Sequence, residues 1–340
     1  MKWIILATLT MLATAAPVNA EPLDDCRAYN RIRKNVITKA ARFNNIKLLS
    51  SCAQTKNLPR KTQAVINNNL CGEYNGVNDY KKAIKSCKKA ISFNPKHAKI
   101  YQNRGNSYQK IGSLKLAIAD YNKALTLKKD TISVLLSRGD TLRAQGKLEL
   151  ALADYKTVLS LNAKSALAHA SIGRIYRKMK KNSMAIDSFS QAIALNNSKR
   201  VISLAAYYRG LILSKEKKWQ KAIDDFQLSI KSNPRYISPV AALARIRATN
   251  KNSKFRDAKE SVKLAKKVIS LKGWKNAGYL ALLAYSYAAT GNFPDAIVTQ
   301  EKALELLTKD RKMSTNRKQW KKEKYTKQLN LFKENKPWRE

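Results

Sequence analysis

AKIYQNRGNSYQKIGSLKLAIADYNKALTLKKDT, residues Ala98–Thr131, is the stretch that decides the fold of this chain. Apolar and small residues recur in it every three or four positions, first over Tyr101–Tyr108 and again over Leu114–Ala124. That spacing is the period of a helix with one buried face. A turn at Ile111–Ser113 separates the two runs. The stretch is therefore expected to form two short antiparallel helices joined by this turn.

The same pattern returns with a period of 34 residues. Each unit has a glycine in its first helix, an alanine in its second helix, and an aromatic residue four positions after that alanine. In three successive units these residues are Gly105, Ala117 and Tyr121, then Gly139, Ala151 and Tyr155, then Gly173, Ala185 and Phe189. This period with these residues is the signature of the tetratricopeptide repeat, so the chain resembles the tetratricopeptide-repeat (TPR) family.

The resemblance implies an all-α fold, a right-handed α-solenoid of TPR helix-turn-helix repeats with N- and C-terminal capping helices. Residues 21–63 are expected to be a helical N-terminal cap or degenerate repeat, and residues 311–340 a basic C-terminal capping helix. The solenoid is expected over residues 64–310, with three extra residues, 200–202, before its fifth repeat. About seven repeats are predicted, at 64–97, 98–131, 132–165, 166–199, 203–236, 237–272 and 277–310.

The chain is strongly basic, with a formal net charge of +44 from 67 Lys and Arg against 23 Asp and Glu. This charge indicates either an anionic partner or a compositional habit of the source genome. The 48 lysines far outnumber the 19 arginines and are scattered over every repeat, which favours the compositional explanation for them. In the last helix, Trp320, Tyr325, Leu329 and Phe332 are expected on one side and the lysines on a solvated face. A membrane- or nucleic-acid-binding helix is the alternative there.

Residues 1–20 have the layout of a cleaved signal peptide. Lys2 precedes an apolar segment, Trp3–Ala16, and small residues end the stretch at Val18–Ala20. The apolar run is shorter than the roughly 20 residues that a membrane-spanning helix needs. Cleavage is expected after Ala20, and no other stretch is apolar enough to give the mature chain a transmembrane segment. The sequence therefore predicts a periplasmic or secreted protein.

The cysteines are expected to form two disulfide bonds, because they are even in number and the chain is expected to be exported. They are Cys26, Cys52, Cys71 and Cys87. A step of 34 residues maps Cys71 onto Gly105 and Cys87 onto Tyr121, two positions that should face each other across a helical hairpin. The predicted pair is therefore Cys71–Cys87, and elimination leaves Cys26–Cys52. A zinc site is the alternative, but the spacings do not match and the chain has only two histidines.

Catalytic chemistry has little support in the sequence. His97 lies in a turn, and His169 occupies the position that Tyr101 has one unit earlier, so a packed aromatic substitute is expected. The chain has no G-x-S-x-G, no H-E-x-x-H and no phosphate-binding glycine loop. We therefore expect a protein that is not an enzyme, with no catalytic residues, no metal site and no cofactor.

The resemblance also implies where a ligand would bind. TPR proteins usually hold peptides or protein surfaces in the concave groove lined by the first helix of each hairpin. One subclass clamps a C-terminal carboxylate with Lys and Asn at set positions, of which only Asn106 is present here, so that mode is not supported. The candidate ligand-binding residues on the concave face are Gln102, Asn106, Gln109, Asp140, Arg143, Arg174, Arg177, Tyr207 and Arg245.

The arginines on this face suggest what the ligand is. Arginine suits bidentate contact with carboxylate or phosphate better than lysine does. We therefore predict an exported scaffold that binds a peptide or protein segment, an acidic one if Arg143, Arg174 and Arg177 take part. The alternative is a binder of a polyanion, nucleic acid or a charged envelope glycan. Base-stacking platforms need exposed aromatic residues, and most aromatic residues here fall on core positions, which favours the scaffold.

Overall fold

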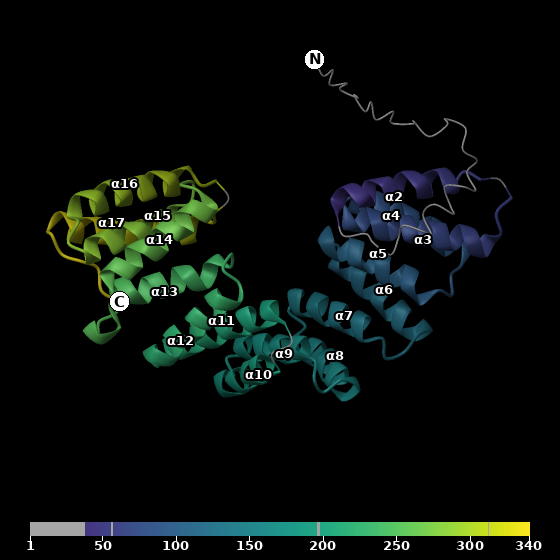
Figure 1. Cartoon of the computed structure of the whole chain (residues 1–340), viewed down its shortest axis with the longest axis horizontal. Helices are drawn as coiled ribbons and strands as arrows, with labels where there is room; N and C mark the ends of the chain where they lie inside the picture. The colour runs from purple at the N-terminus through teal and green to yellow at the C-terminus, as the bar shows by residue number, and fades with distance from the viewer. Residues whose placement is uncertain (1–37, 56, 196–197, 312) are drawn as a thin grey trace, which may run out of the picture. The chain divides into compact units, whose positions relative to one another are not determined.

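The computed structural model describes residues 38–55, 57–195, 198–311 and 313–340. Every regular element in these ranges is helical, and none of the described residues forms a strand (Figure 1). The all-α class expected from the sequence is therefore confirmed. The chain divides into two compact units, residues 1–157 and 158–340.

The first unit is built from helical hairpins. Its helices are α2 (Lys39–Cys52), α3 (Arg60–Gly76), α4 (Tyr80–Phe93), α5 (Ala98–Lys110), α6 (Leu114–Leu127) and α7 (Ile132–Ala144). Helix α3 pairs with α4 and α5 with α6, while α4 packs on α5 and α6 on α7. Each hairpin therefore covers the apolar face of the next, as an α-solenoid requires. The division between the units falls inside α8 (Leu148–Leu161).

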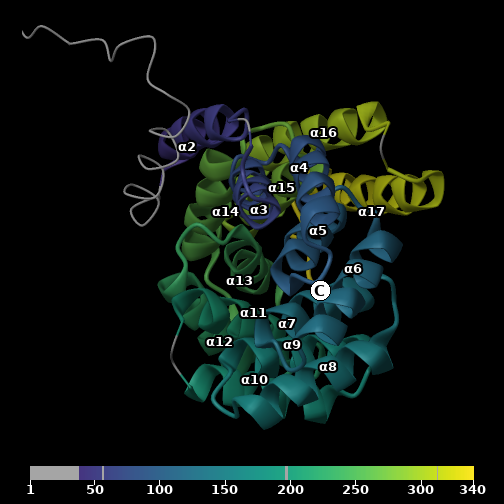
Figure 2. The same ribbon diagram turned by 90° about the vertical axis from the view of Figure 1, so that its right-hand side faces the viewer.

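The second unit continues the same pairing. Its helices are α9 (Ala166–Lys178), α10 (Asn182–Ala194), α11 (Lys199–Lys215), α12 (Trp219–Ser232), α13 (Ile237–Thr249), α14 (Ala258–Lys272), α15 (Ala277–Ala289), α16 (Phe293–Lys309) and α17 (Thr315–Lys333). Four hairpins form from α9 to α16, and α17 lies beside α16 (Figure 2). A short 3₁₀ turn, Ser253–Phe255, lies in the longer connection of the sixth repeat.

The turn inside each regular hairpin uses one residue with a left-handed backbone. Its φ lies between 59° and 84° in six hairpins. Glycine adopts this conformation at no steric cost and asparagine tolerates it, whereas another residue pays roughly 1–2 kcal/mol. The residues in this position are Asn78, Gly112, Gly146, Lys180, Lys217 and Gly291. Gly112 in the stretch 98–131 thus occupies a turn position that two other repeats fill with a strained lysine.

A second glycine explains the close approach of the two helices in a hairpin. A Cβ atom added at Gly105 would lie 2.8 Å from the ring of Tyr121, and that ring is fully buried. The same contact recurs between Gly139 and Tyr155, Gly173 and Phe189, and Gly210 and Phe226. The repeated glycine and aromatic residue therefore form one contact in each of these hairpins, in which the ring packs directly on the glycine backbone.

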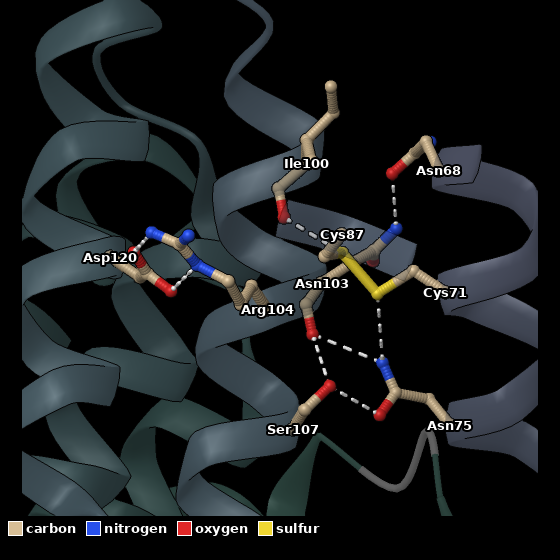
Figure 3. The surroundings of a disulfide bond; sticks show 9 residues. All are labelled: Asn68, Cys71, Asn75, Cys87, Ile100, Asn103, Arg104, Ser107 and Asp120. Atoms are coloured by element: carbon tan, nitrogen blue, oxygen red, sulfur yellow. Dashed lines mark hydrogen bonds and ion pairs between the residues drawn. A yellow bond between two sulfur atoms is a disulfide. The ribbon is translucent and has the colours of Figure 1, made fainter. Parts of the chain in front are cut away.

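In the hairpin α3–α4 a disulfide bond takes the place of this contact. Cys71 and Cys87 are joined, with their Cα atoms 5.3 Å apart, and both are fully buried (Figure 3). This is the pair expected from the repeat register. Cys52 is buried against Leu49 and Ile66, but its expected partner, Cys26, lies outside the described residues. That second pairing stays a prediction.

Among the described residues, three hairpins share one bidentate Arg–Asp ion pair that was not predicted from the sequence. In the α5–α6 hairpin, the Arg104 guanidinium donates both Nε and Nη2 to the carboxylate of Asp120, at 2.8 and 2.7 Å (Figure 3). The same bidentate pair joins Arg138 to Asp154 and Arg209 to Asp225. Each arginine precedes the packed glycine, and each aspartate precedes the aromatic residue. These pairs clamp the two helices beside the ring contact.

The outer helices dock by different means. In α2, Arg42 and Asn45 donate to the two carboxylate oxygens of the buried Glu73, at 2.9 and 3.0 Å. In α17, Tyr325, Leu329 and Phe332 are buried as expected, but Trp320 is 60% exposed and does not share their face. Among the described residues, no helix is both long and apolar enough to cross a membrane.

Candidate functional site

The predicted ligand-binding residues fall in both units. Gln102, Asn106, Gln109, Asp140 and Arg143 belong to the first unit, and Arg174, Arg177, Tyr207 and Arg245 belong to the second.

In the first unit, three of the predicted residues already form hydrogen bonds within the chain. Gln102 is only 5% exposed, and its Nε2 donates to Ser133 Oγ at 2.9 Å. Gln109 Nε2 donates to Thr141 Oγ1 at 2.7 Å, so both amides tie α5 to α7. Asn106 Oδ1 accepts from the Tyr121 hydroxyl at 2.8 Å and thereby orients the packed ring. These side chains have a structural use.

The remaining two residues of this set neutralise each other. Arg143 Nη2 donates to Asp140 Oδ1 at 3.1 Å, and the same oxygen accepts from the Tyr155 hydroxyl at 3.0 Å. Arg143 Nε is buried without a hydrogen-bond partner. The positive charge of Arg143 is therefore neutralised by Asp140, which lies one helical turn away.

The second unit brings Arg174, Arg177 and Tyr207 together with two further tyrosines. The guanidinium carbon of Arg177 lies 4.6 Å from the centre of the Tyr208 ring, and that of Arg174 lies 5.5 Å from it. The ring of Tyr207 lies 5.2 Å from that of Tyr208 and 5.1 Å from that of Tyr236. We call Arg174, Arg177, Tyr207, Tyr208 and Tyr236 the arginine–tyrosine cluster.

Helix geometry and packing position this cluster. Arg174 and Arg177 are three residues apart on α9, so both point to the same side of that helix. Tyr208 on α11 stacks on the buried ring of Phe189 at 6.0 Å, which holds it under the two guanidinium groups. Tyr207 lies 6.1 Å from Phe226, another ring of the hairpin core. The cluster is therefore mounted on the repeated ring contacts of two hairpins.

The cluster carries two positive charges with no carboxylate among the described residues in an ion pair with either. Attraction between a guanidinium and a ring face contributes roughly 0.5–2 kcal/mol, but it leaves the N–H donors unused. Arg177 Nε is buried without a hydrogen-bond partner. Burial raises the pKa of both Tyr207 and Tyr236, so neither phenol supplies a negative charge at neutral pH. The cluster therefore combines two positive charges with guanidinium donors that have no carboxylate partner among the described residues.

Arg245 lies on α13, and its positive charge, like that of Arg177, opposes the rise that burial causes in the pKa of Tyr207. Its side chain is exposed, and its Nε donates to the Tyr285 hydroxyl at 3.3 Å. Burial raises the pKa of Tyr285 above its usual value, the positive charge of Arg245 reducing that shift, so the phenol stays neutral. Arg245 therefore keeps its charge beside a hydroxyl group.

Family models match four of the repeats. One model described as tetratricopeptide repeat matches residues 98–130, and a second with the same description matches residues 72–97 and 166–199. A third model, described as TPR repeat, matches residues 139–179. The chain belongs to the tetratricopeptide-repeat family. The family expected from the sequence is thereby confirmed.

Solved structures of other TPR proteins have the same fold. PilF of Pseudomonas aeruginosa is 20% identical, with a TM-score of 0.54 over 63% of this chain and 93% of that one. A tetratricopeptide repeat protein from Parabacteroides merdae is 14% identical, with a TM-score of 0.53 over 92% of this chain and 99% of that one. A search of curated protein sequences gives no significant match. At these identities the likeness extends to the fold.

Two members of the cluster in this TPR protein, Tyr208 and Tyr236, were not predicted from the sequence. Of the three tyrosines, only Tyr207 was among the predicted ligand-binding residues, and neither Tyr208 nor Tyr236 was assigned a role. The consecutive pair Tyr207-Tyr208 was the available signal, because neighbours on a helix point about 100° apart and one of two rings must leave the core. The position of Tyr236 gives no such signal, since it directly follows the turn that ends α12.

Proposed function

We propose that this TPR protein is an exported, non-enzymatic interaction scaffold that binds a peptide or protein segment, and that an acidic side chain of that segment docks at the arginine–tyrosine cluster. The observation that carries the proposal is the pair of arginines, Arg174 and Arg177, held over one ring without a carboxylate partner among the described residues. In a folded protein a buried guanidinium donor is ordinarily satisfied. An incoming carboxylate supplies what is lacking.

The chemistry of the cluster favours a carboxylate on a peptide. A guanidinium binds a carboxylate through two parallel hydrogen bonds, which fix its orientation as well as its charge. Tyr207 and Tyr208 provide an aromatic wall against which the aliphatic part of a Glu or Asp side chain packs. The positive field of the chain adds faster capture at low salt.

The export part of the proposal rests on residues 1–20, which lie outside the described residues. Support comes from the Cys71–Cys87 bond, because structural disulfides persist in oxidising compartments. N-terminal sequencing of the protein from its native host should start at Glu21. A chain that starts at Met1 and remains in the cytosol would contradict export.

The binding part is tested with a fluorescent acidic peptide, a blocked octamer of alternating Glu and Ala, and its Gln counterpart. Arg174→Ala/Arg177→Ala should weaken binding of the Glu peptide about tenfold or more, because hydrogen bonds to charged groups contribute roughly 1.5–3 kcal/mol. The matched control is Lys199→Ala/Arg200→Ala, which removes two exposed charges from α11. Equal losses in both variants would contradict the assignment of the site.

The net charge of +44 favours a second candidate function, the binding of a polyanion. Affinity for nucleic acid falls steeply with salt, with a logarithmic slope of roughly −0.7 per neutralised phosphate for single strands. A 20-nucleotide single-stranded DNA serves as the probe. The peptide proposal expects a shallow slope for the Glu peptide and specific loss on Arg174→Ala/Arg177→Ala. A polyanion binder would instead prefer the DNA and lose similar affinity in the Lys199→Ala/Arg200→Ala control.

A further inference from the structure

The segment beyond the last helix, Lys336–Glu340, folds back onto the end of α13. Arg339 Nη1 donates to the Ala248 carbonyl at 2.9 Å, and the Glu340 backbone N–H donates to the Thr249 carbonyl at 2.7 Å. Figure 1 shows the chain end beside α13. Ala248 and Thr249 are the last two residues of that helix, so their carbonyls have no partner within it. The segment satisfies the open end of α13.

Side-chain contacts hold the same segment to α17. Lys324 of α17 forms an ion pair with Glu340, and Trp338 Nε1 donates to a carboxylate oxygen of Glu340 at 3.0 Å. Lys324 Nζ also lies 5.7 Å from the centre of the Trp338 ring. Trp338 packs against the apolar core of α13 to α17. An indole and a carboxylate two residues apart are thus recognised together by one lysine.

The electrostatics show that Glu340 is held as an anion. Burial alone would raise its pKa, but hydrogen bonds from Lys324 and Trp338 and the positive charges of Lys324 and Arg245 lower it by more, so the net pKa lies below the usual value. Arg245 is one of the residues that the sequence placed on the ligand-binding face. Glu340 therefore lies close enough to Arg245 for the arginine's positive charge to stabilise its carboxylate.

We propose that this surface is a second peptide-binding site, which the chain's own 336–340 segment occupies, and that a partner's extended segment with a tryptophan followed two residues later by an acidic residue exchanges with it. We call Arg245, Ala248, Thr249 and Lys324 the α13–α17 seat. The seat uses residues distinct from those of the arginine–tyrosine cluster, so the inference does not depend on the function proposed there.

The bound segment has the features of an exchangeable ligand. Residues 336–340 have no regular structure, and none of them is fully buried. Pro337 cannot continue α17 and favours an extended chain. A segment with few buried contacts opens at a small cost compared with global unfolding. A carbonyl of α13 accepts from a backbone N–H of the segment, a contact that any extended peptide can reproduce.

The test uses the full chain and the blocked, fluorescent peptide KPWRE. Trp338→Ala/Glu340→Gln removes the indole and the negative charge that hold the chain's own segment to Lys324 of α17, so the seat should open. The peptide should bind this variant at least about tenfold more tightly than it binds the parent chain. Peptides with Ala for Trp or Gln for Glu should bind the variant at least about tenfold more weakly than KPWRE. Equal binding of KPWRE to parent and variant, or no binding to either, would overturn the proposal.

Further substitutions place the peptide and check folding. In the opened variant, Lys324→Ala should lower the affinity for KPWRE, while the matched change Lys322→Ala on the exposed side of α17 should not. Arg174→Ala/Arg177→Ala should leave the affinity unchanged, and a loss there would assign the peptide to the cluster and overturn the seat. Glu340→Gln alone, with helical signal and Tm compared with those of the parent, gives the same answer if the double change impairs folding.

Discussion

In this TPR protein the close approach of the two helices in a hairpin determines which residue fits at position 105. The ring of Tyr121 lies where a side chain at position 105 would begin, and its hydroxyl is fixed by Asn106. The ring therefore has no free direction in which to move. Glycine is required at this position by contact, although it is a poor helix former.

Gly105→Ala should for this reason destabilise the protein, by roughly 1–3 kcal/mol, as overpacking of a core does. The matched control is Gly72→Ala in α3, where an added Cβ meets nothing within 4 Å. That change should stabilise by up to about 1 kcal/mol through helix propensity. Urea unfolding of both variants provides the comparison. A stabilised Gly105→Ala protein would show that the ring contact is not close in solution.

The Cys71–Cys87 bond acts on the unfolded chain. Its two cysteines are 16 residues apart, and closing a loop of this size removes about 3 kcal/mol of chain entropy from the unfolded state. Cys71→Ser/Cys87→Ser should lower the free energy of unfolding by about that amount. Unfolding of the oxidised parent and the variant in urea measures it. Equal stabilities would mean that the bond is absent or strained in solution.

Residue positions were predictable from the sequence where the repeat register fixed them. Cys71 and Cys87 could be paired because they replace a glycine and an aromatic residue that face each other in the other repeats. The pair Tyr207-Tyr208 indicates that one ring leaves the core, but the contact of Tyr208 with Arg174 and Arg177 of the preceding hairpin is not part of the repeat register, so Tyr208 was not assigned. The left-handed Lys180 could not be recognised either, since lysine carries no signal for that conformation.

At the level of helices, hairpins differ in what holds them together. The α5–α6 hairpin is held by the ring contact and by the Arg104–Asp120 pair, with the aspartate side chain only 6% exposed. The α9–α10 hairpin has Ile172 and Ser188 in place of that pair. Ile172 is buried without a charge and the Ser188 hydroxyl donates to the Met184 carbonyl of its own helix, so this hairpin avoids the desolvation cost of a buried ion pair.

Asp120→Asn should destabilise the protein by roughly 1.5–3 kcal/mol, because Arg104 then loses its charged acceptor while remaining mostly buried. Asp187→Asn, an exposed aspartate on α10, serves as the control and should change stability by less than about 0.5 kcal/mol. Thermal or urea unfolding measures both. Equal effects would show that the pair contributes nothing beyond surface charge.

Helix-level prediction succeeded because the period of 34 residues sets helix, turn and partner together. The insertion at 200–202 appears as an earlier start of α11, at Lys199. The Arg–Asp pairs were readable in principle, since an arginine precedes the glycine and an aspartate precedes the aromatic residue in the same three hairpins. The contact of residues 336–340 with α13 was not readable, because it joins positions 91 residues apart outside the repeat register.

The whole chain has 67 cationic side chains against 23 acidic ones, so its folded state depends on its few carboxylates to offset repulsion between positive charges. As pH falls the carboxylates are neutralised and positive self-repulsion grows, so the folded state weakens. This general loss affects the parent and any variant alike. The behaviour of a single carboxylate is therefore visible only as a difference between two chains.

Glu340 offers such a difference. Its pKa is lowered in the folded chain, chiefly because its hydrogen bonds and neighbouring cations outweigh its burial. A lowered carboxyl pKa contributes stability above the unfolded value, here 4.5, and that contribution is lost as pH falls through the folded value. The free energy of unfolding of the parent should therefore exceed that of Glu340→Gln at about pH 7, and the gap should close by about pH 3. Urea unfolding of both chains across this range measures it. A gap that widens toward acid would mean that Glu340 binds its proton more tightly when folded, and that Lys324 and Arg245 do not hold it as an anion.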